Sequence, residues 1–205
     1  MENILTEANL LAGIHLWRTQ KPNWPRDFHN EYYQELSRLK QNGLNANWWR
    51  QMVNYLSGWR ALRPLTKEEI HGRAVGRLGQ LQTTYNHIVA SHAGESLNLT
   101  TVNWESLEEL YSVAFDIKDV NSPVFGSKLC HFILPNAFPV IDRDVIGVDA
   151  RAYHEYWQFC KVQWTECTER EALQQMLRQA IGEAVHIEYP YSTKVTELCI
   201  IGSRV

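Results

Sequence analysis

A lysine and an aspartate that could break a glycosidic bond lie close together in the segment from Ser122 to Val148. The segment joins a Gly-x-Lys step at Gly126–Lys128 to a short apolar run, and then to a Pro-bounded turn that ends in Asp142. Cleavage of the C1′–N bond of a nucleotide passes through a positively charged sugar, which a nearby carboxylate stabilises. A deprotonated lysine amine can also attack C1′ and form a Schiff base. The two residue types therefore indicate chemistry at a glycosidic bond, and we favour a simple hydrolysis led by Asp142.

The same residues also have purely structural interpretations. An aspartate that follows Pro-Val-Ile and precedes a helical turn often caps that helix, so Asp142 fits a cap as well as a catalyst. Lys128 alone fits a solvated helix position or a phosphate contact. His131 follows Lys128 by about one helical turn, so it either faces the same cleft or is a histidine satisfied in the core or at the surface.

The segment resembles, in degenerate form, the catalytic segment of the helix-hairpin-helix DNA glycosylases. Gly126–Lys128 resembles the exit of the family's hairpin, and the run from 129 to 134 stands where the family has the following helix. Phe138–Asp142 resembles the family's Pro-x-Asp turn. The resemblance implies that the last residue of this turn is the catalytic aspartate and that Lys128 takes the place of the family's lysine.

The resemblance also implies contacts with DNA. Gly126 and Ser127 would lie at the DNA backbone, and we expect Arg143, the residue after the aspartate, to contact DNA as well. The family's hairpin has Gly-x-Gly where this chain has Pro123–Gly126, and Asp144 stands at a position where the family often has histidine. We therefore carry over no metal site and expect no cofactor.

Trp48 and Trp49 are candidates for contact with an extruded base. Adjacent helix residues point about 100° apart, so one ring can pack in the core while the other is exposed. An exposed tryptophan stacks on a flipped base or fills the gap that the base leaves. Core packing of both rings is the alternative. His131 is the third candidate for the base pocket.

Three glycines and two arginines alternate within a segment of helical spacing. Gly72, Gly76 and Gly79 share one face, and Arg73 and Arg77 share the neighbouring one. Each glycine inside a helix costs about 1 kcal/mol relative to alanine, so we look for a compensating role. Close helix packing would explain the glycines alone, whereas close approach to a phosphate backbone would explain both residue types. A solvated basic face is the third interpretation.

Nearly every periodic segment of the chain has helical spacing, which predicts an all-α fold of about eight or nine helices. The expected helices cover 31–41, 48–59, 66–90, a segment starting near 103, 129–134, 150–163, 168–182 and 192–201. We expect one compact α-helical domain over residues 1–205, with a lobe boundary near 91–102. The resemblance implies a glycosylase-like arrangement of two lobes flanking a cleft.

Composition narrows the class of protein. The 205 residues are 44% hydrophobic and 21% charged, which is typical of a globular domain. The net charge of −3 counts against a strong non-specific nucleic-acid binder but allows a DNA enzyme with one basic face. The four cysteines form no CxxC pair, no run of 18 apolar residues occurs, and the N-terminus lacks a basic signal region. We therefore expect a soluble, cytoplasmic protein with no membrane contact.

The leading hypothesis is a monofunctional DNA glycosylase that flips a modified base and hydrolyses its N-glycosidic bond, leaving an abasic site. Because bacterial enzymes of this broad type include ones that attack modified bases in phage genomes, a role in phage defence is part of the hypothesis. The alternative is a non-catalytic helical module that binds DNA or protein. A third interpretation, an enzyme acting on a small nucleoside or nucleotide, needs the carboxylate but no basic groove.

Overall fold

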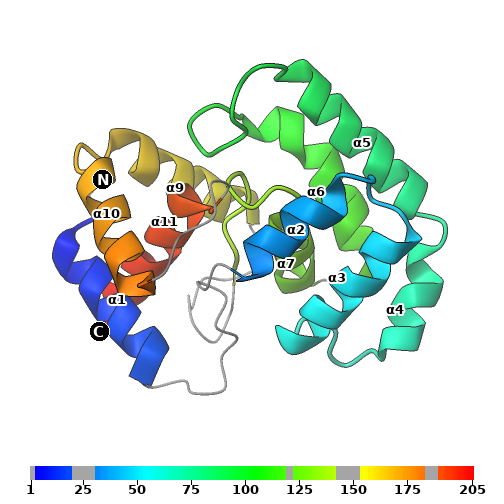
Figure 1. Cartoon of the computed structure of the whole chain (residues 1–205), viewed down its shortest axis with the longest axis horizontal. Coiled ribbons are helices and arrows are strands. Elements are labelled where there is room, and N and C mark those ends of the chain that lie inside the picture. The colour runs from blue at the N-terminus through cyan, green and yellow to red at the C-terminus, as the bar shows by residue number, and fades with distance from the viewer. Residues whose placement is uncertain (1–2, 20–30, 119–121, 142–152, 183–188) are drawn as a thin grey trace.

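The structure is a computed structural model that describes residues 3–19, 31–118, 122–141, 153–182 and 189–205 (Figure 1). These residues form ten α-helices and no strand, which confirms the all-α prediction. Figure 1 shows the helices in two groups, and both chain ends lie in the first. The first group is α1 (Glu7–Thr19), α9 (Tyr153–Glu166), α10 (Arg170–Ile181) and α11 (Tyr191–Gly202). The second is α2 (Glu31–Lys40), α3 (Ala46–Gly58), α4 (Lys67–Ala74), α5 (Leu78–Ser91), α6 (Trp104–Lys118) and α7 (Pro123–Ile133).

Several helix ends follow the capping residues that the sequence offers. Asn45 caps α3, because its side chain accepts from the backbone N–H groups of Asn47 and Trp48. Thr66 and Glu69 form the predicted capping box at the start of α4. Gly182 ends α10 at φ +78°, a left-handed conformation that glycine adopts without steric cost.

The predicted long helix from 66 to 90 is wrong. The chain forms α4 up to Ala74, turns through Val75–Arg77, and starts α5 at Leu78. A Cβ added at Gly72, Gly76 or Gly79 would meet no atom within 4 Å, so close helix packing does not explain these glycines. Their low helix propensity accounts instead for the break between α4 and α5.

The predicted hairpin exit at Gly126–Lys128 is also wrong. Helix α7 starts at Pro123, where proline suits the first helical turn, and runs through all three residues to Ile133. The expected helix from 129 to 134 is therefore the second half of a longer one. Glycine serves packing here, because a Cβ at Gly126 would lie 3.2 Å from the ring of Tyr111 on α6.

Helices α1 and α11 cross at very short distance and tie the two ends of the chain together. A Cβ at Gly13 would lie 2.0 Å from the carbonyl oxygen of Leu198, and one at Gly202 would lie 1.8 Å from that of Asn9. The two backbones therefore touch at both glycines. Helix α1 was not among the helices expected from the sequence.

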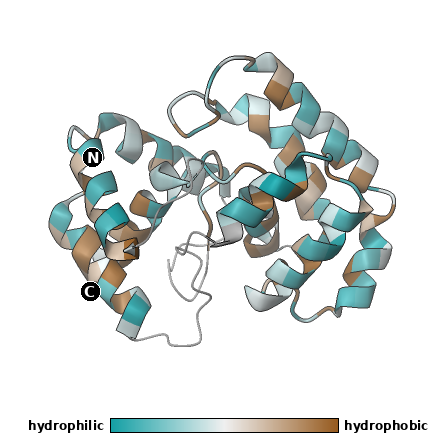
Figure 2. Cartoon of the chain, in the orientation of Figure 1, coloured by the Kyte–Doolittle hydropathy of each residue, from teal (hydrophilic) through white to brown (hydrophobic). Residues whose placement is uncertain are grey.

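Among the described helices, α7 and α11 are buried almost throughout. Every described residue of α11 from Ser192 to Gly202 is buried, as is α7 from Phe125 to Ile133. Figure 2 shows a different pattern on outer helices such as α2, α3 and α5, where hydrophilic and hydrophobic residues alternate as in amphipathic helices. Both buried helices nevertheless carry lysine and other polar residues, and these residues form the candidate site.

The loop from 92 to 103 joins α5 and α6, which pack against each other. The lobe boundary expected near 91–102 stays a prediction. Within the described ranges, no helix has both the length and the apolar character needed to cross a membrane.

Candidate functional site

Asp142 and Arg143 lie outside the described residues, but the chain that leads to them is described up to Ile141. We call Ala137–Ile141 the clamped segment, because side chains bind its backbone from several helices. Most of the bonds are short: Trp157 Nε1 to Ala137 O (2.8 Å), His131 Nδ1 to Phe138 O (2.7 Å), Tyr153 OH to Pro139 O (2.7 Å), Val140 N to Glu197 Oε1 (2.6 Å), Tyr156 OH to Val140 O (3.1 Å) and Ile141 N to Ser127 Oγ (3.2 Å).

These partners come from three different helices. Ser127 and His131 lie on α7, three aromatic residues on α9, and Glu197 on α11. Buried backbone groups need hydrogen-bond partners. The N–H groups of Ala137 and Phe138 donate to the backbone carbonyl of Leu134, and side chains bind the other groups named above. The clamped segment is therefore fixed in position up to the residue before Asp142.

Lys128 is buried next to the clamped segment. Only 5% of its surface is exposed, and its Nζ donates a hydrogen bond to the carbonyl oxygen of Trp59 at 2.9 Å. Ser127, the preceding residue, is fully buried and binds Ile141. Lys128 is thus not the solvated helix residue of the structural interpretation.

Lys194 and Glu197 form a buried ion pair on α11. Their Nζ and Oε2 atoms are 2.9 Å apart, and the other carboxylate oxygen accepts from the N–H of Val140. Lys194 Nζ also lies 5.3 Å from the centre of the Trp59 ring, a cation–π distance. Because α11 belongs to one group of helices and Trp59 follows α3 in the other, these contacts join the two groups.

His131 is a neutral, fully buried histidine with both ring nitrogens occupied. Its Nδ1 lies 2.7 Å from the Phe138 carbonyl, which only accepts, so Nδ1 carries the hydrogen. Nε2 then accepts from Tyr33 OH at 3.0 Å. Burial, reinforced by the positive charge of Lys194, holds the pKa of His131 well below its ordinary value. His131 is therefore a core histidine with its hydrogen bonds satisfied, one of the interpretations that the sequence allowed. Its role in a base pocket stays a prediction.

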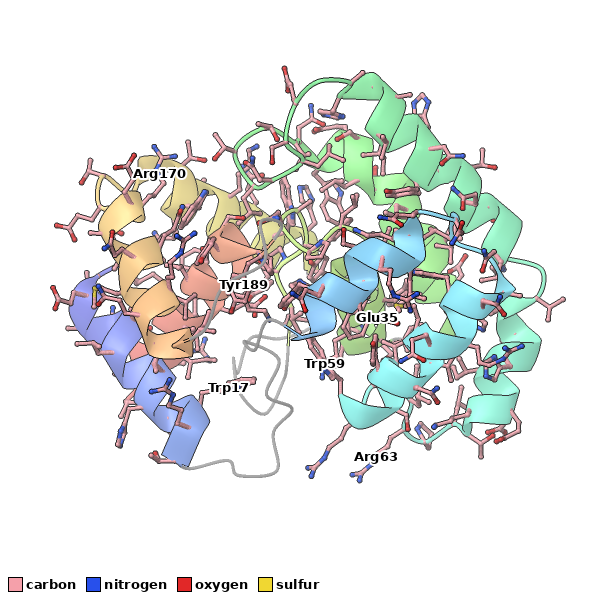
Figure 3. All side chains as sticks on the ribbon, in the orientation of Figure 1. Trp17, Glu35, Trp59, Arg63, Arg170 and Tyr189 are labelled. Carbon is pink, nitrogen blue, oxygen red and sulfur yellow. The ribbon has the colours of Figure 1, made fainter. Side chains whose placement is uncertain are left out.

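The ring of Trp59 lies at the centre of these groups. It packs 5.9 Å from the ring of His131 and 4.6 Å from that of Phe132, measured between centroids. We call the set Trp59, Lys128, His131, Lys194 and Glu197 the Trp59 cluster. Figure 3 shows Trp59 and Tyr189 toward the middle of the molecule, where the two groups of helices approach each other.

The other predicted site residues lie apart from the Trp59 cluster or inside the core. Trp48 and Trp49 are 1% and 3% exposed, which places both rings in core packing, and their stacking on a base stays a prediction. Arg73 donates to the backbone carbonyl of Lys118. Arg73 and Arg77 line a surface pocket together with Asp116 and Ile117, and DNA binding there stays a prediction.

Sequence reasoning missed Trp59, Lys194 and Glu197 as site residues. A usable signal was present in α11, where a lysine and a glutamate three residues apart directly precede the apolar run Leu198–Ile201. Charged residues are rarely buried unless they are paired, and this spacing allows the pair. Trp59 gave no such signal, because it continues the apolar face of α3.

Among the described residues, no group of three or more His, Cys, Asp or Glu side chains is placed to hold a metal ion. Comparison with known proteins finds no matching family model, no similar curated protein and no similar solved structure.

Proposed function

We propose that this chain is a monofunctional DNA glycosylase in which Asp142 promotes hydrolysis of the N-glycosidic bond of a flipped, modified base. In this reaction water adds to C1′, the base leaves with the electrons of the C1′–N bond and takes up a proton, and an abasic site remains. The carboxylate stabilises the positive charge that develops on the sugar. A role in defence against phages with modified bases is part of this proposal.

The clamped segment is the observation that supports this proposal best. Six side chains from three helices hold five consecutive residues, yet none of those five offers an ionisable side chain of its own. A catalytic group must be held within a fraction of an ångström of its working position. A rigid segment that ends one residue before Asp142 meets that requirement for an aspartate at the next position.

The surroundings of Lys128 support hydrolysis rather than a Schiff base. Its amine is engaged by the Trp59 carbonyl and enclosed by neighbouring side chains. We therefore propose that water, not Lys128, attacks C1′, and that Lys128 shapes the site. The two groups of helices would then be the lobes of a glycosylase-like fold. DNA would enter between them, with Arg143, Arg73 and Arg77 as the proposed contacts. The expected DNA contacts at Gly126 and Ser127 are not part of this proposal, because both residues are buried inside α7.

One observation favours the second candidate, a non-catalytic helical module that binds DNA or protein. Each charged member of the Trp59 cluster has a partner within the protein, so the cluster can be explained by stability alone. The two candidates differ in what they expect of Asp142: catalysis in the first, a helix cap in the second.

Mass spectrometry of free base released from a panel of modified DNAs, including phage genomic DNA, separates the two candidates. Asp142→Asn is the decisive variant, because asparagine caps a helix as well as aspartate but lacks the charge. Asp142→Ala removes both the cap and the charge, and Glu95→Gln is the matched carboxyl-to-amide control in an exposed loop. Release that persists in Asp142→Asn excludes the proposed mechanism. Absence of release from every DNA by a folded wild-type protein favours the binding module.

A further inference from the structure

A short loop after α3, residues 59–64, is bound from the inside by two buried lysines. Lys128 donates to the carbonyl of Trp59 at 2.9 Å, and Lys118 donates to the carbonyls of Ala61 at 2.8 Å and Arg63 at 2.6 Å. Lys118, the last residue of α6, is 5% exposed. We call residues 59–64 the arginine loop. Its backbone oxygens at alternate positions thus point to positive charge inside the protein.

The backbone of the arginine loop is held in a costly conformation. Arg60 has φ +56°, a left-handed value that is sterically unfavourable for a residue with a side chain. Hydrogen bonds from Arg60 N to Ser57 O (3.0 Å) and from Ala61 N to Leu56 O (2.8 Å) fix the turn. These two bonds are the pattern in which many helices end, with a left-handed residue just after the helix, so the end of α3 itself fixes the start of the loop.

The side chains of the arginine loop divide between the inside and the outside. Ala61 and Leu62 are buried at 2% and 5% exposure, whereas Arg60 and Arg63 are exposed. Figure 3 shows Arg63 projecting away from the ribbons at the edge of the second group of helices, below Trp59. Leu62 and Ala61 anchor the loop, so the two arginines are presented on a rigid support.

Both guanidinium groups are available for a ligand. Within the described ranges, neither Arg60 nor Arg63 makes a hydrogen bond or an ion pair through its side chain. Arg38 and Arg73, by contrast, are engaged: Arg38 pairs with Glu35, and Arg73 donates to the Lys118 carbonyl. The two ammonium groups beneath the loop add to the positive potential without using the arginines.

We propose that the arginine loop is a binding site for the phosphate backbone of duplex DNA, in which Arg60 and Arg63 contact neighbouring phosphates. The planar fork of a guanidinium matches phosphate geometry, and a fixed loop loses little entropy on binding. Lys118 and Lys128 act as positioning residues for the two arginines. The inference rests on the proposed function only for its choice of DNA as the polyanion, and it adds a contact site beyond Arg73 and Arg77.

Binding to unmodified duplex DNA, measured by fluorescence anisotropy over a range of salt concentrations, tests the inference without any turnover. For Arg60→Ala with Arg63→Ala, we expect the slope of log K against log salt, which is negative, to become shallower by about 2. The affinity at 0.1 M salt should fall by about eightfold for each arginine, or about sixtyfold together. Both substituted residues are exposed, and alanine keeps the non-glycine character of position 60.

The control is Arg170→Ala with Arg204→Ala, which removes the same charge from the first group of helices. Arg170 begins α10 (Figure 3), and Arg204 follows the end of α11. A loss equal to that of the control, an unchanged salt slope, or no binding of duplex DNA by the wild type would overturn the inference. Arg60→Lys with Arg63→Lys should keep the salt slope and lose only part of the affinity. Base release is a separate readout. If the alanine variant loses DNA binding and the wild type releases no base, the DNA-binding role of the arginine loop is supported and the glycosylase proposal is rejected.

Discussion

The clamped segment and the arginine loop are both short irregular segments whose backbone is bound by side chains, but they differ in which side chains bind them and in what they expose. The clamped segment is bound by hydroxyl, indole, imidazole and carboxylate groups, and all five of its side chains are buried. The arginine loop is bound by two ammonium groups and presents two exposed guanidinium groups.

This difference indicates what each segment positions. Nothing in the clamped segment can react or bind charge, so its rigidity serves the residue that follows it. The arginine loop carries its own functional groups, so its rigidity serves those groups directly. Substitutions of the side chains that hold each segment test this difference.

The largest expected effect on stability concerns the ion pair beside the clamped segment. Lys194→Met takes the ammonium partner away from the buried carboxylate of Glu197, which should lower the free energy of unfolding by about 3–5 kcal/mol. Chemical denaturation of the variant measures this loss. The double variant Lys194→Met with Glu197→Gln should recover much of it, because glutamine is neutral and still accepts from Val140. A double variant no more stable than the single one would show that the charge is not the cause.

The arginine loop should lose its support when Lys118 is replaced. Lys118→Met leaves the carbonyls of Ala61 and Arg63 without their donor, and we expect unfolding to become easier by about 3 kcal/mol. Burial, and secondarily the charge of Lys128, lowers the pKa of Lys118. Lys67→Met removes an exposed lysine and is the matched control, with an expected change within about 0.5 kcal/mol. Equal thermal stability of the two variants would contradict the account of the loop.

His131 should make the clamped segment sensitive to acid. The folded protein holds the pKa of His131 well below 6.5, whereas the unfolded chain takes up a proton as the pH falls through that value. The unfolded state therefore binds more protons at low pH. The free energy of unfolding should decrease by about 2 kcal/mol when the pH is lowered from 7 to 5.

Denaturation midpoints at both pH values test this for wild type, His131→Gln and the exposed control His87→Gln. We expect a flatter pH dependence in His131→Gln alone. An unchanged dependence in that variant would mean that another group causes the acid sensitivity.

The smallest expected effect separates stability from binding in the arginine loop. Arg60→Gly relieves the left-handed conformation, so the free energy of unfolding should rise by up to about 1 kcal/mol. The same variant should bind duplex DNA more weakly, because it lacks one guanidinium. Thermal melting and anisotropy on one preparation give both values. A variant that is both less stable and unchanged in binding would contradict both claims.

The sequence predicted the helices whose ends carry local signals. The Thr66–Glu69 box and Gly182 are such signals, and the helices beside them start or end where expected. The break at Val75–Arg77 was missed because helical periodicity continues across it. The start of α7 at Pro123 was missed because the resemblance favoured a hairpin there.

The contacts of the candidate site could not be predicted in the same way. Lys128 and Trp59 are 69 residues apart in the chain, and Glu197 and Val140 are 57 apart. Hydrogen bonds of this range follow from the packing of α7 and α11 and leave no local pattern in the sequence. Lys128 was singled out in advance by its spacing to Asp142, whereas its partner was not.

The central claim is that the fixed segment ending at Ile141 serves a catalytic aspartate at position 142. The most direct test compares base release by wild type and Asp142→Asn on the same modified DNA, with duplex binding and melting temperature measured in parallel. The account predicts release by the wild type only, at equal DNA affinity and nearly equal stability. Equal release by both proteins, or a variant that loses release only because it has lost its fold, would contradict it.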